Sequence, residues 1–125
     1  MSNLNLLQPN QARTDYQEYL LSKHWQAFRA EAIEFYGKQC FYPYCERIEN
    51  FGCYCNINHL NYNHMGKEEL SDVVPLCQYH HHLWHEGFLN CPRWIIANQE
   101  KRLDEAGLMY AENRIDWSLI RETTI

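Results

Sequence analysis

The sequence predicts one small α+β domain, because helical periodicity at both ends of the chain encloses a middle that has none. Apolar residues recur at helical spacing over residues 15–36. Residues 40–77 are crowded with Asn, Tyr and Gly, and two runs, "CYCNINHL" and "VVPLC", predict a hairpin with a long loop between its strands. The run "QYHHHLWHE" then predicts a short helix that ends at Gly87. A chain of 125 residues is long enough for one hydrophobic core.

The N-terminal helix is expected over residues 15–36, with Thr14 as its N-cap in a capping-box pattern and Gly37 at its end. Residues 1–13 are expected to form a flexible arm, and His24 to be exposed. One helical stripe is predicted to face the core: Leu21, Trp25, Phe28, Ala32 and Phe35.

The domain is expected to span residues 14–125, with its core at about 38–90 and C-terminal helices within 92–121. Asn90 and Pro92 are typical of a helix start, and Gly107 of its end. Three residues of this helix are expected to point inward: Trp94, Ile95 and Leu103. A short helix after Asp116 is expected to dock through Trp117 and Ile120.

The charge balance limits the ways in which this chain can bind nucleic acid. With 11 basic and 16 acidic residues the net charge is −5, so any phosphate-binding surface has to be local or assisted by a metal or a partner. No export signal and no apolar run of membrane-spanning length occurs, so we expect a cytoplasmic protein without membrane contact. We therefore expect the six cysteines to be metal ligands or buried thiols and not to form disulfides.

Two ligand pairs are spaced as in a structural zinc site. Cys40 and Cys45 form one pair, and Cys77 and His80 form the other about thirty residues later. Three thiolates and one imidazole fill a tetrahedral shell and leave no open position. A rival assignment would use Cys53, Cys55 or Cys91, which are as easily explained as small buried hydrophobes.

The remaining histidines of the same run suggest a second, open site. His81 and His85 are four residues apart and hence neighbours on one helix face, a spacing that lets two imidazoles bind one divalent ion. His82 is expected to be exposed, although His82 with His85 is an alternative pair. Two histidines leave coordination positions free, as metal-assisted hydrolysis requires.

These motifs resemble the HNH, or ββα-metal, endonuclease family. The matching segments are "INHLNY", "GKEELSDVVPLC" and "CQYHHHLWH", and "YLLSKHWQAFRAEAIEFYGKQC" resembles the helix that precedes the domain in many bacterial and phage members. The resemblance covers about residues 19–87. It implies a ββα-metal core, made of a β-hairpin and a metal-binding helix, with a zinc knuckle and flanking helices.

The resemblance also implies roles for individual residues. His59 would be the general base, Asp72 would brace the catalytic loop, and Asn58, His81 and His85 would hold the catalytic ion. Cys40, Cys45, Cys77 and His80 correspond to the zinc knuckle, in which the family usually has a second Cys at the position of His80. The family also usually has His or Asp at the position of Asn58, whose neutral oxygen is a weaker ligand but suits hard cations.

The expected function is hydrolysis of phosphodiester bonds by a metal-dependent endonuclease or nickase, with a structural Zn²⁺ and one catalytic Mg²⁺, Mn²⁺, Ni²⁺ or Zn²⁺. DNA is favoured over RNA as substrate, with possible help from a partner subunit or a homodimer. Expected nucleic-acid contacts are Arg47, Lys67, Arg93 and Tyr62, whereas Glu68 and His64 are expected to face solvent. The alternative function is a catalytically idle zinc-knuckle module that binds nucleic acid or a protein.

Overall fold

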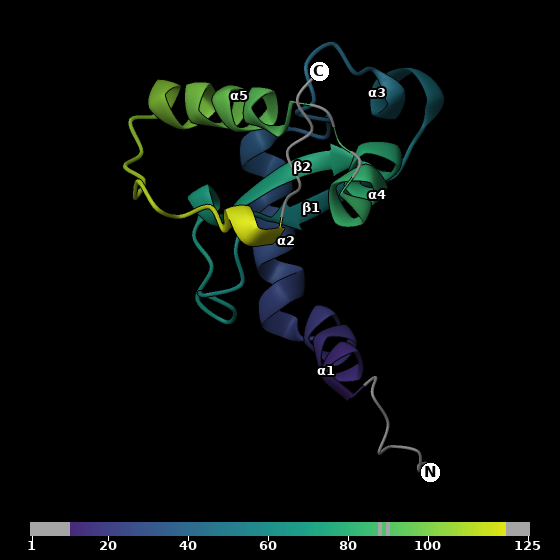
Figure 1. Ribbon diagram of the computed structural model, residues 1–125, viewed down its shortest axis with the longest axis vertical. Coiled ribbons are helices and arrows are strands. Elements are labelled where there is room, and N and C mark those ends of the chain that lie inside the picture. Colours follow the sequence, from purple (N-terminus) through teal and green to yellow (C-terminus); the bar gives the residue numbers. More distant parts are fainter. Residues whose placement is uncertain (1–10, 88, 90, 120–125) are drawn as a thin grey trace.

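A two-stranded antiparallel hairpin lies at the centre of the structure (Figure 1). The computed structural model describes residues 11–87, 89 and 91–119, with side chains from residue 15 onward. Strand β1 (Cys55–His59) pairs with β2 (Val73–Cys77), so that Cys55 lies opposite Cys77 and His59 opposite Val73. Every residue of β2 is buried. Both strands were predicted from their β-rich runs, and the structure confirms an α+β fold.

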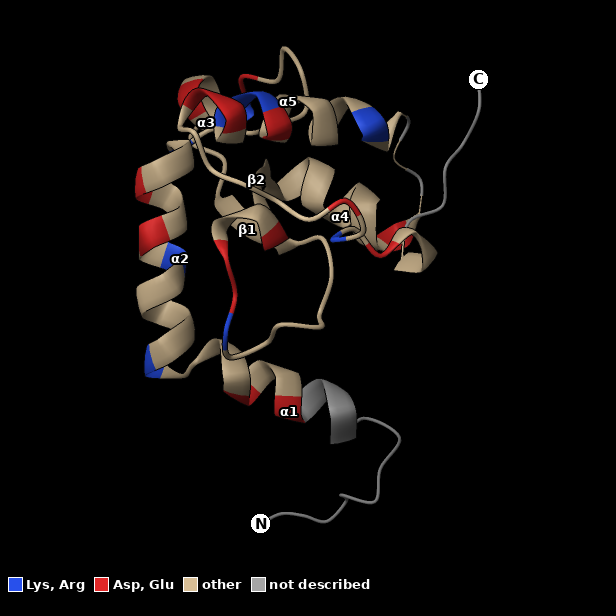
Figure 2. Ribbon diagram, turned by 90° about the vertical axis from the view of Figure 1, so that its left-hand side faces the viewer, with Lys and Arg blue, Asp and Glu red and all other residues tan. Residues whose placement is uncertain are grey.

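Five α-helices surround the hairpin in the described part of the chain. Helix α4 (Gln78–Glu86) follows β2 directly and ends at Gly87, as predicted. Helix α2 (Lys23–Tyr36) and helix α4 both pack on the strands. Figures 1 and 2 show helix α5 (Pro92–Glu105) and helix α1 (Gln11–Leu20) at opposite ends of the molecule, with the hairpin between them.

The predicted N-terminal helix is two helices, which corrects the expectation of one helix over residues 15–36. Helix α1 begins at Gln11, inside the predicted arm, so Thr14 is not an N-cap. The helix is interrupted at Leu21, which is 80% exposed. Ser22 then caps α2 by accepting a hydrogen bond from the Trp25 N–H at 3.1 Å. Residues 1–10 of the predicted arm lie outside the described residues.

A short helix, α3 (Arg47–Phe51), lies between α2 and the hairpin and was not predicted. Ile48 is its one buried side chain, and five residues are too few to produce a helical hydrophobic pattern. It ends at Gly52, whose φ of 65° lies in the left-handed region.

Helix α5 matches its predicted position but not its predicted face. Pro92 lies in its first turn, and Ile95 and Leu103 are fully buried as expected. Trp94 is 54% exposed, so its predicted inward orientation is wrong. The expected cap Asn90 lies outside the described residues.

A short helix was expected after Asp116, and the described residues form a 3-10 helix there, η3 (Trp117–Leu119). Trp117 is 36% exposed, and its predicted partner Ile120 lies outside the described residues. In the part of the chain that the structure describes, no helix has the length and apolar character needed to cross a membrane.

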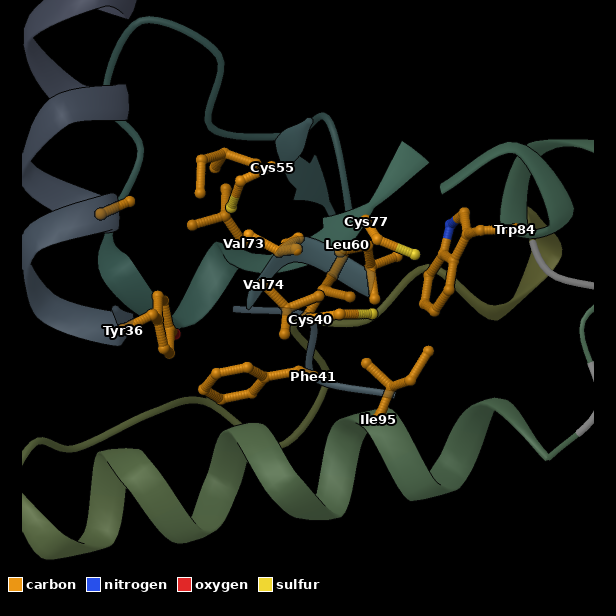
Figure 3. Packing of buried hydrophobic residues seen from close by; sticks show 14 of the residues in the cluster. Tyr36, Cys40, Phe41, Cys55, Leu60, Val73, Val74, Cys77, Trp84 and Ile95 are labelled. Carbon is orange, nitrogen blue, oxygen red and sulfur yellow. The ribbon is translucent and has the colours of Figure 1, made fainter. Parts of the chain in front are cut away.

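The hydrophobic core joins the hairpin to α2, α4 and α5. Figure 3 shows side chains from all of these elements pointing toward one another around the strands, with Cys40 and Cys77 among them. Its central members include Tyr36, Phe41, Leu60, Val74, Trp84 and Ile95.

A buried polar clamp holds α5 to the beginning of β2. The Gln99 side chain is fully buried and donates hydrogen bonds to the carbonyl oxygens of Ser71 at 3.1 Å and Val73 at 2.8 Å. Its own oxygen accepts a bond of 2.8 Å from Arg114, which is 5% exposed. The Ser71 carbonyl also accepts a bond of 3.1 Å from Arg114 Nε, so Gln99 and Arg114 together satisfy the buried polar groups at this junction.

We expect Gln99→Leu to lower the free energy of unfolding by about 2–4 kcal/mol, because it removes one hydrogen bond each from the Ser71 carbonyl, the Val73 carbonyl and the buried Arg114 guanidinium. Urea denaturation measures this loss. Lys101→Leu, on an exposed position of the same helix, is the control and should change stability by less than about 0.5 kcal/mol. Equal effects of the two substitutions would contradict the role of Gln99.

Candidate metal centres and the His59 network

Four side chains that are distant in sequence meet at the junction of β2 and α4. Cys40 follows α2, Cys45 precedes α3, Cys77 ends β2, and His80 lies in the first turn of α4. Their ligand atoms all lie within 4.8 Å of one another. This Cys3His cluster can hold a metal ion such as zinc.

The distances in the cluster suit a tetrahedral ion. With Zn–S of about 2.3 Å and Zn–N of about 2.0 Å, tetrahedral ligands lie about 3.5–3.8 Å apart. The Cys45 and Cys77 sulfurs are 3.8 Å apart, and His80 Nδ1 lies 3.5 Å from the Cys40 sulfur and 3.3 Å from that of Cys77. The Tyr42 ring stacks on His80 with centroids 4.2 Å apart and fixes the orientation of the imidazole.

Burial tunes the groups of this cluster in opposite directions. It lowers the pKa of His80 to about 4, with a smaller contribution from Arg47, so the imidazole is neutral at pH 7. It raises the pKa of the Cys40 and Cys77 thiols. A bound cation reverses that effect and keeps the sulfurs as thiolates. The rival ligands are elsewhere: Cys53 accepts a hydrogen bond from the Gln78 N–H, and the cluster does not include it.

His59 lies at the end of β1 in a nearly closed environment. Its side chain is 1% exposed. The Trp25 ring stacks on it at 4.8 Å, and the rings of Tyr62 and Tyr16 lie 5.1 and 6.4 Å away. Tyr62, an expected nucleic-acid contact, therefore packs against His59.

His59 is held by Glu68, whose carboxylate lies 3.0 Å from Nε2. Glu68 was expected to be solvated, but its side chain is 1% exposed and also binds Tyr19 and, at 2.8 Å, His24. Burial alone would raise the pKa of Glu68, but the hydrogen bonds from Tyr19, His59 and His24 outweigh it and lower the pKa to about 2. His24 is 43% exposed in its side chain, so it is a surface residue with a role in this network.

Asp72 braces the loop between the strands. It is 2% exposed and accepts hydrogen bonds from Asn61 Nδ2 at 3.2 Å and from the Glu69 N–H at 2.9 Å. His64 faces solvent as expected, with a side chain that is 55% exposed, and its Nδ1 lies 3.1 Å from the same carboxylate. Since Asn61 and His64 belong to the loop after His59, Asp72 fixes the backbone that follows His59.

Asn58 is fully buried, and neither its side-chain oxygen nor its nitrogen has a hydrogen-bond partner among the described residues. Unpartnered buried polar atoms are rare in native proteins, and an absent ion is one of the ordinary reasons for them. The free Oδ1 is the observation by which Asn58 fits a ligand role. The amide carbonyl is a hard donor of the kind that Mg²⁺ or Mn²⁺ accepts.

His81 and His85 present two nitrogens to one point. Their Nε2 atoms are 3.1 Å apart, close to the separation of two imidazole ligands on one divalent ion. Burial, with smaller contributions from His85 and His82, lowers the pKa of His81 to about 4, and burial also lowers that of His85. His59 contributes to the shift at His85, so the end of β1 lies near this face of α4. His82 is exposed, as expected.

The remaining predicted nucleic-acid contacts lie on three different elements of the structure. Arg47 stacks on Tyr79 at 4.2 Å and lies beside the Cys3His cluster, since it contributes to the pKa of His80. Arg93 lies 4.5 Å from the Trp117 ring near the C-terminal segment. Lys67 is exposed on the long loop, next to Glu68.

The low pKa of Glu68 predicts an acid-dependent loss of stability. Its folded pKa of about 2 lies below the ordinary value of 4.5, so the ionised carboxylate contributes stability that is present above pH 4.5 and lost as the pH falls toward 2. The contribution is about 2–3 kcal/mol. Urea denaturation between pH 6 and 3 should show a smaller loss on acidification in Glu68→Gln than in the parent chain.

Glu105→Gln, at an exposed position on α5, is the matched control and should follow the parent profile. Parallel profiles for the parent chain and Glu68→Gln would contradict the ion pairing of Glu68.

Comparison with protein-family models, with curated proteins and with solved structures gives no match to this chain.

Proposed function

We propose that this chain is a metal-dependent nuclease that hydrolyses phosphodiester bonds, an endonuclease or nickase acting on DNA, with His59 as its general base. One observation carries the proposal: an imidazole fixed by a buried carboxylate lies near two paired histidines, and the residue before it on β1, Asn58, has an unpartnered side-chain oxygen. The order of these motifs along the chain, which resembles that of HNH endonucleases with a ββα-metal core, supports the same function.

Glu68 determines which ring nitrogen of His59 carries the proton. A carboxylate with a pKa of about 2 is ionised at neutral pH, so it accepts the Nε2 proton of the ring. That tautomer leaves Nδ1 with its lone pair, able to take a proton from an attacking water. The negative Glu68 also stabilises the imidazolium that forms, so the two residues act as a base and its orienting partner.

Asn58, His81 and His85 would hold the divalent ion of the reaction. Such an ion stabilises the charge that develops on a phosphate oxygen and on the departing 3′ oxygen. The lowered pKa values of His81 and His85 keep both rings neutral, as ligation requires. Asp72 keeps the loop after His59 in place through Asn61 and needs no contact with substrate.

The burial of His59 sets a requirement on this mechanism. Because the His59 side chain is 1% exposed, water reaches Nδ1 only when one of the covering rings, Tyr16, Trp25 or Tyr62, moves.

The burial of His59 favours the second candidate function, a catalytically idle zinc-knuckle module that binds nucleic acid or a protein. Metal stoichiometry and cleavage together separate the two: one tightly held zinc, no second ion and no cleavage favour the idle module.

We further propose that the Cys3His cluster holds a structural Zn²⁺. One zinc per chain is expected by elemental analysis, and chelation should lower the thermal midpoint by at least about 10 °C, since zinc binding contributes on the order of 10 kcal/mol in small zinc peptides. Cys45→Ala should lose the zinc, whereas Cys53→Ala, outside the cluster, should keep it. A midpoint that chelation leaves unchanged would contradict the structural role.

Plasmid nicking in Mg²⁺, Mn²⁺, Ni²⁺ or Zn²⁺ tests the nuclease. His59→Ala should lower the rate by about 10²–10⁴-fold, because it removes the general base. Asn58→Asp should reach its half-maximal rate at a lower metal concentration, because a carboxylate is a stronger ligand than an amide oxygen.

The matched control is His82→Ala, which changes an exposed histidine of the same helix and should leave the rate unchanged. Absence of cleavage by the parent chain with every metal, or equal cleavage by His59→Ala, would overturn the proposal.

A further inference from the structure

Two adjoining cavities along α2 and β1 share two lining residues, Arg29 and Tyr54. The first, of about 230 Å³, reaches Asn56 and His81. The second, of about 430 Å³, reaches Lys38. We call the two together the Arg29 groove. It joins the α4 face that carries His81 to the end of α2.

The Arg29 groove is locally basic on an acidic chain. Arg29 and Lys38 line it, and no Asp or Glu does so among the described residues. Along the whole of α2, and along α5, acidic and basic residues are mixed (Figure 2). The net charge of −5 makes such a stretch stand out, since a chain of this charge binds phosphate only where cations are concentrated locally.

Arg29 is positioned but not neutralised. Its Nη2 donates to the Tyr54 hydroxyl at 2.8 Å and to the Cys55 carbonyl at 3.2 Å, and its guanidinium carbon lies 5.3 Å from the Tyr54 ring centroid. Among the described residues Arg29 makes no ion pair, so the charge of its planar fork is available to an anion.

Asn56 supplies a second, independent sign of a ligand. Its Nδ2 is buried and has no hydrogen-bond partner among the described residues, although the residue lines the first cavity. A buried donor without a partner costs about 1–3 kcal/mol, and a phosphate oxygen in the cavity would satisfy it. Asn56 lies two residues before Asn58 on β1, so both side chains leave the strand on the same face.

We infer that the Arg29 groove binds the sugar-phosphate backbone of a nucleic-acid strand beside the bond to be cleaved. Arg29 and Lys38 pair with phosphates, Asn56 donates to a phosphate oxygen, and the Tyr54 ring, 58% exposed, stacks on a base or sugar. The inference rests on the proposed function for the identity of its ligand, because His81, at one end of the groove, is a proposed ligand of the catalytic ion. A stacking tyrosine needs the open face of a base, so a single strand should bind at least as tightly as a duplex.

Fluorescence anisotropy with labelled single-stranded DNA, and with a duplex of the same length, tests the inference. All variants carry His59→Ala, which prevents cleavage, and zinc content with a thermal melt verifies their fold. Arg29→Ala and Lys38→Ala should each weaken binding about 5- to 10-fold and lower the slope of log K against log salt by about 0.7–0.9. Tyr54→Ala should weaken binding about 5-fold or more.

Three controls are matched to these changes. Lys23→Ala, on the same helix, and Lys101→Ala, on α5, remove the same charge outside the groove, and Tyr79→Ala removes an exposed aromatic ring of α4. Each should change affinity less than about 2-fold. If Arg29→Ala fails to fold, the test uses Lys38→Ala and Tyr54→Ala together with Arg29→Lys, which keeps the charge. The affinities of these three variants then show whether the groove binds the strand.

The inference is overturned when the groove variants bind no more weakly than their controls, or when the chain binds neither probe. Its failure is distinguishable from failure of the proposed function. A parent chain that nicks plasmid while groove and control variants bind alike retains the nuclease and loses the groove. A parent chain that cuts nothing, but binds single-stranded DNA through Arg29 and Lys38, retains the groove and loses the hydrolysis.

Discussion

The structure depends on the position of Cys77. This residue ends β2 opposite Cys55, caps α4 by accepting a bond of 3.4 Å from the His80 N–H, and belongs to the Cys3His cluster. A single fully buried residue therefore fixes the hairpin register, the start of the helix and the position of the cluster. Any shift of one of these moves the other two, so the histidines of α4 take their places relative to His59 from this junction.

The helix geometry after Cys77 separates the Cys3His cluster from the pair of histidines that belongs to the proposed second site. Successive residues of an α-helix are about 100° apart around its axis, so neighbours in sequence serve different surfaces. His80 is 8% exposed and turns into the Cys3His cluster, while His81 turns with His85 toward the end of β1 and His82 faces solvent. A crowded run of histidines can thus provide one ligand to a closed centre and two to an open one without competition between them.

The sequence predicted the elements whose causes are local. The strands and α4 follow from residues close together in sequence, and the Cys3His cluster was predicted from two closely spaced ligand pairs, Cys40 with Cys45 and Cys77 with His80. The structure bears these predictions out. The helix break at Ser22 was missed because the apolar stripe continues across it, from Leu21 to Trp25, and only the hydroxyl of Ser22 marks a new start. The partners of Glu68 were missed for a different reason. Tyr19 and His24 lie 49 and 44 residues away, and no spacing rule connects them to a loop carboxylate.

Asn58 shows what a neutral ligand means for the free chain. An unpaired amide in the interior costs about 1–3 kcal/mol, whereas an ionised carboxylate in the same place costs several kcal/mol and would require protonation or a cation. Glu68 escapes that cost only because Tyr19, His24 and His59 bind it. Asn58 has no such partners among the described residues, so an asparagine tolerates the metal-free state that an aspartate would oppose. In the proposed site, the weaker affinity expected of an asparagine for the ion is therefore the counterpart of a fold that does not need a second ion to form.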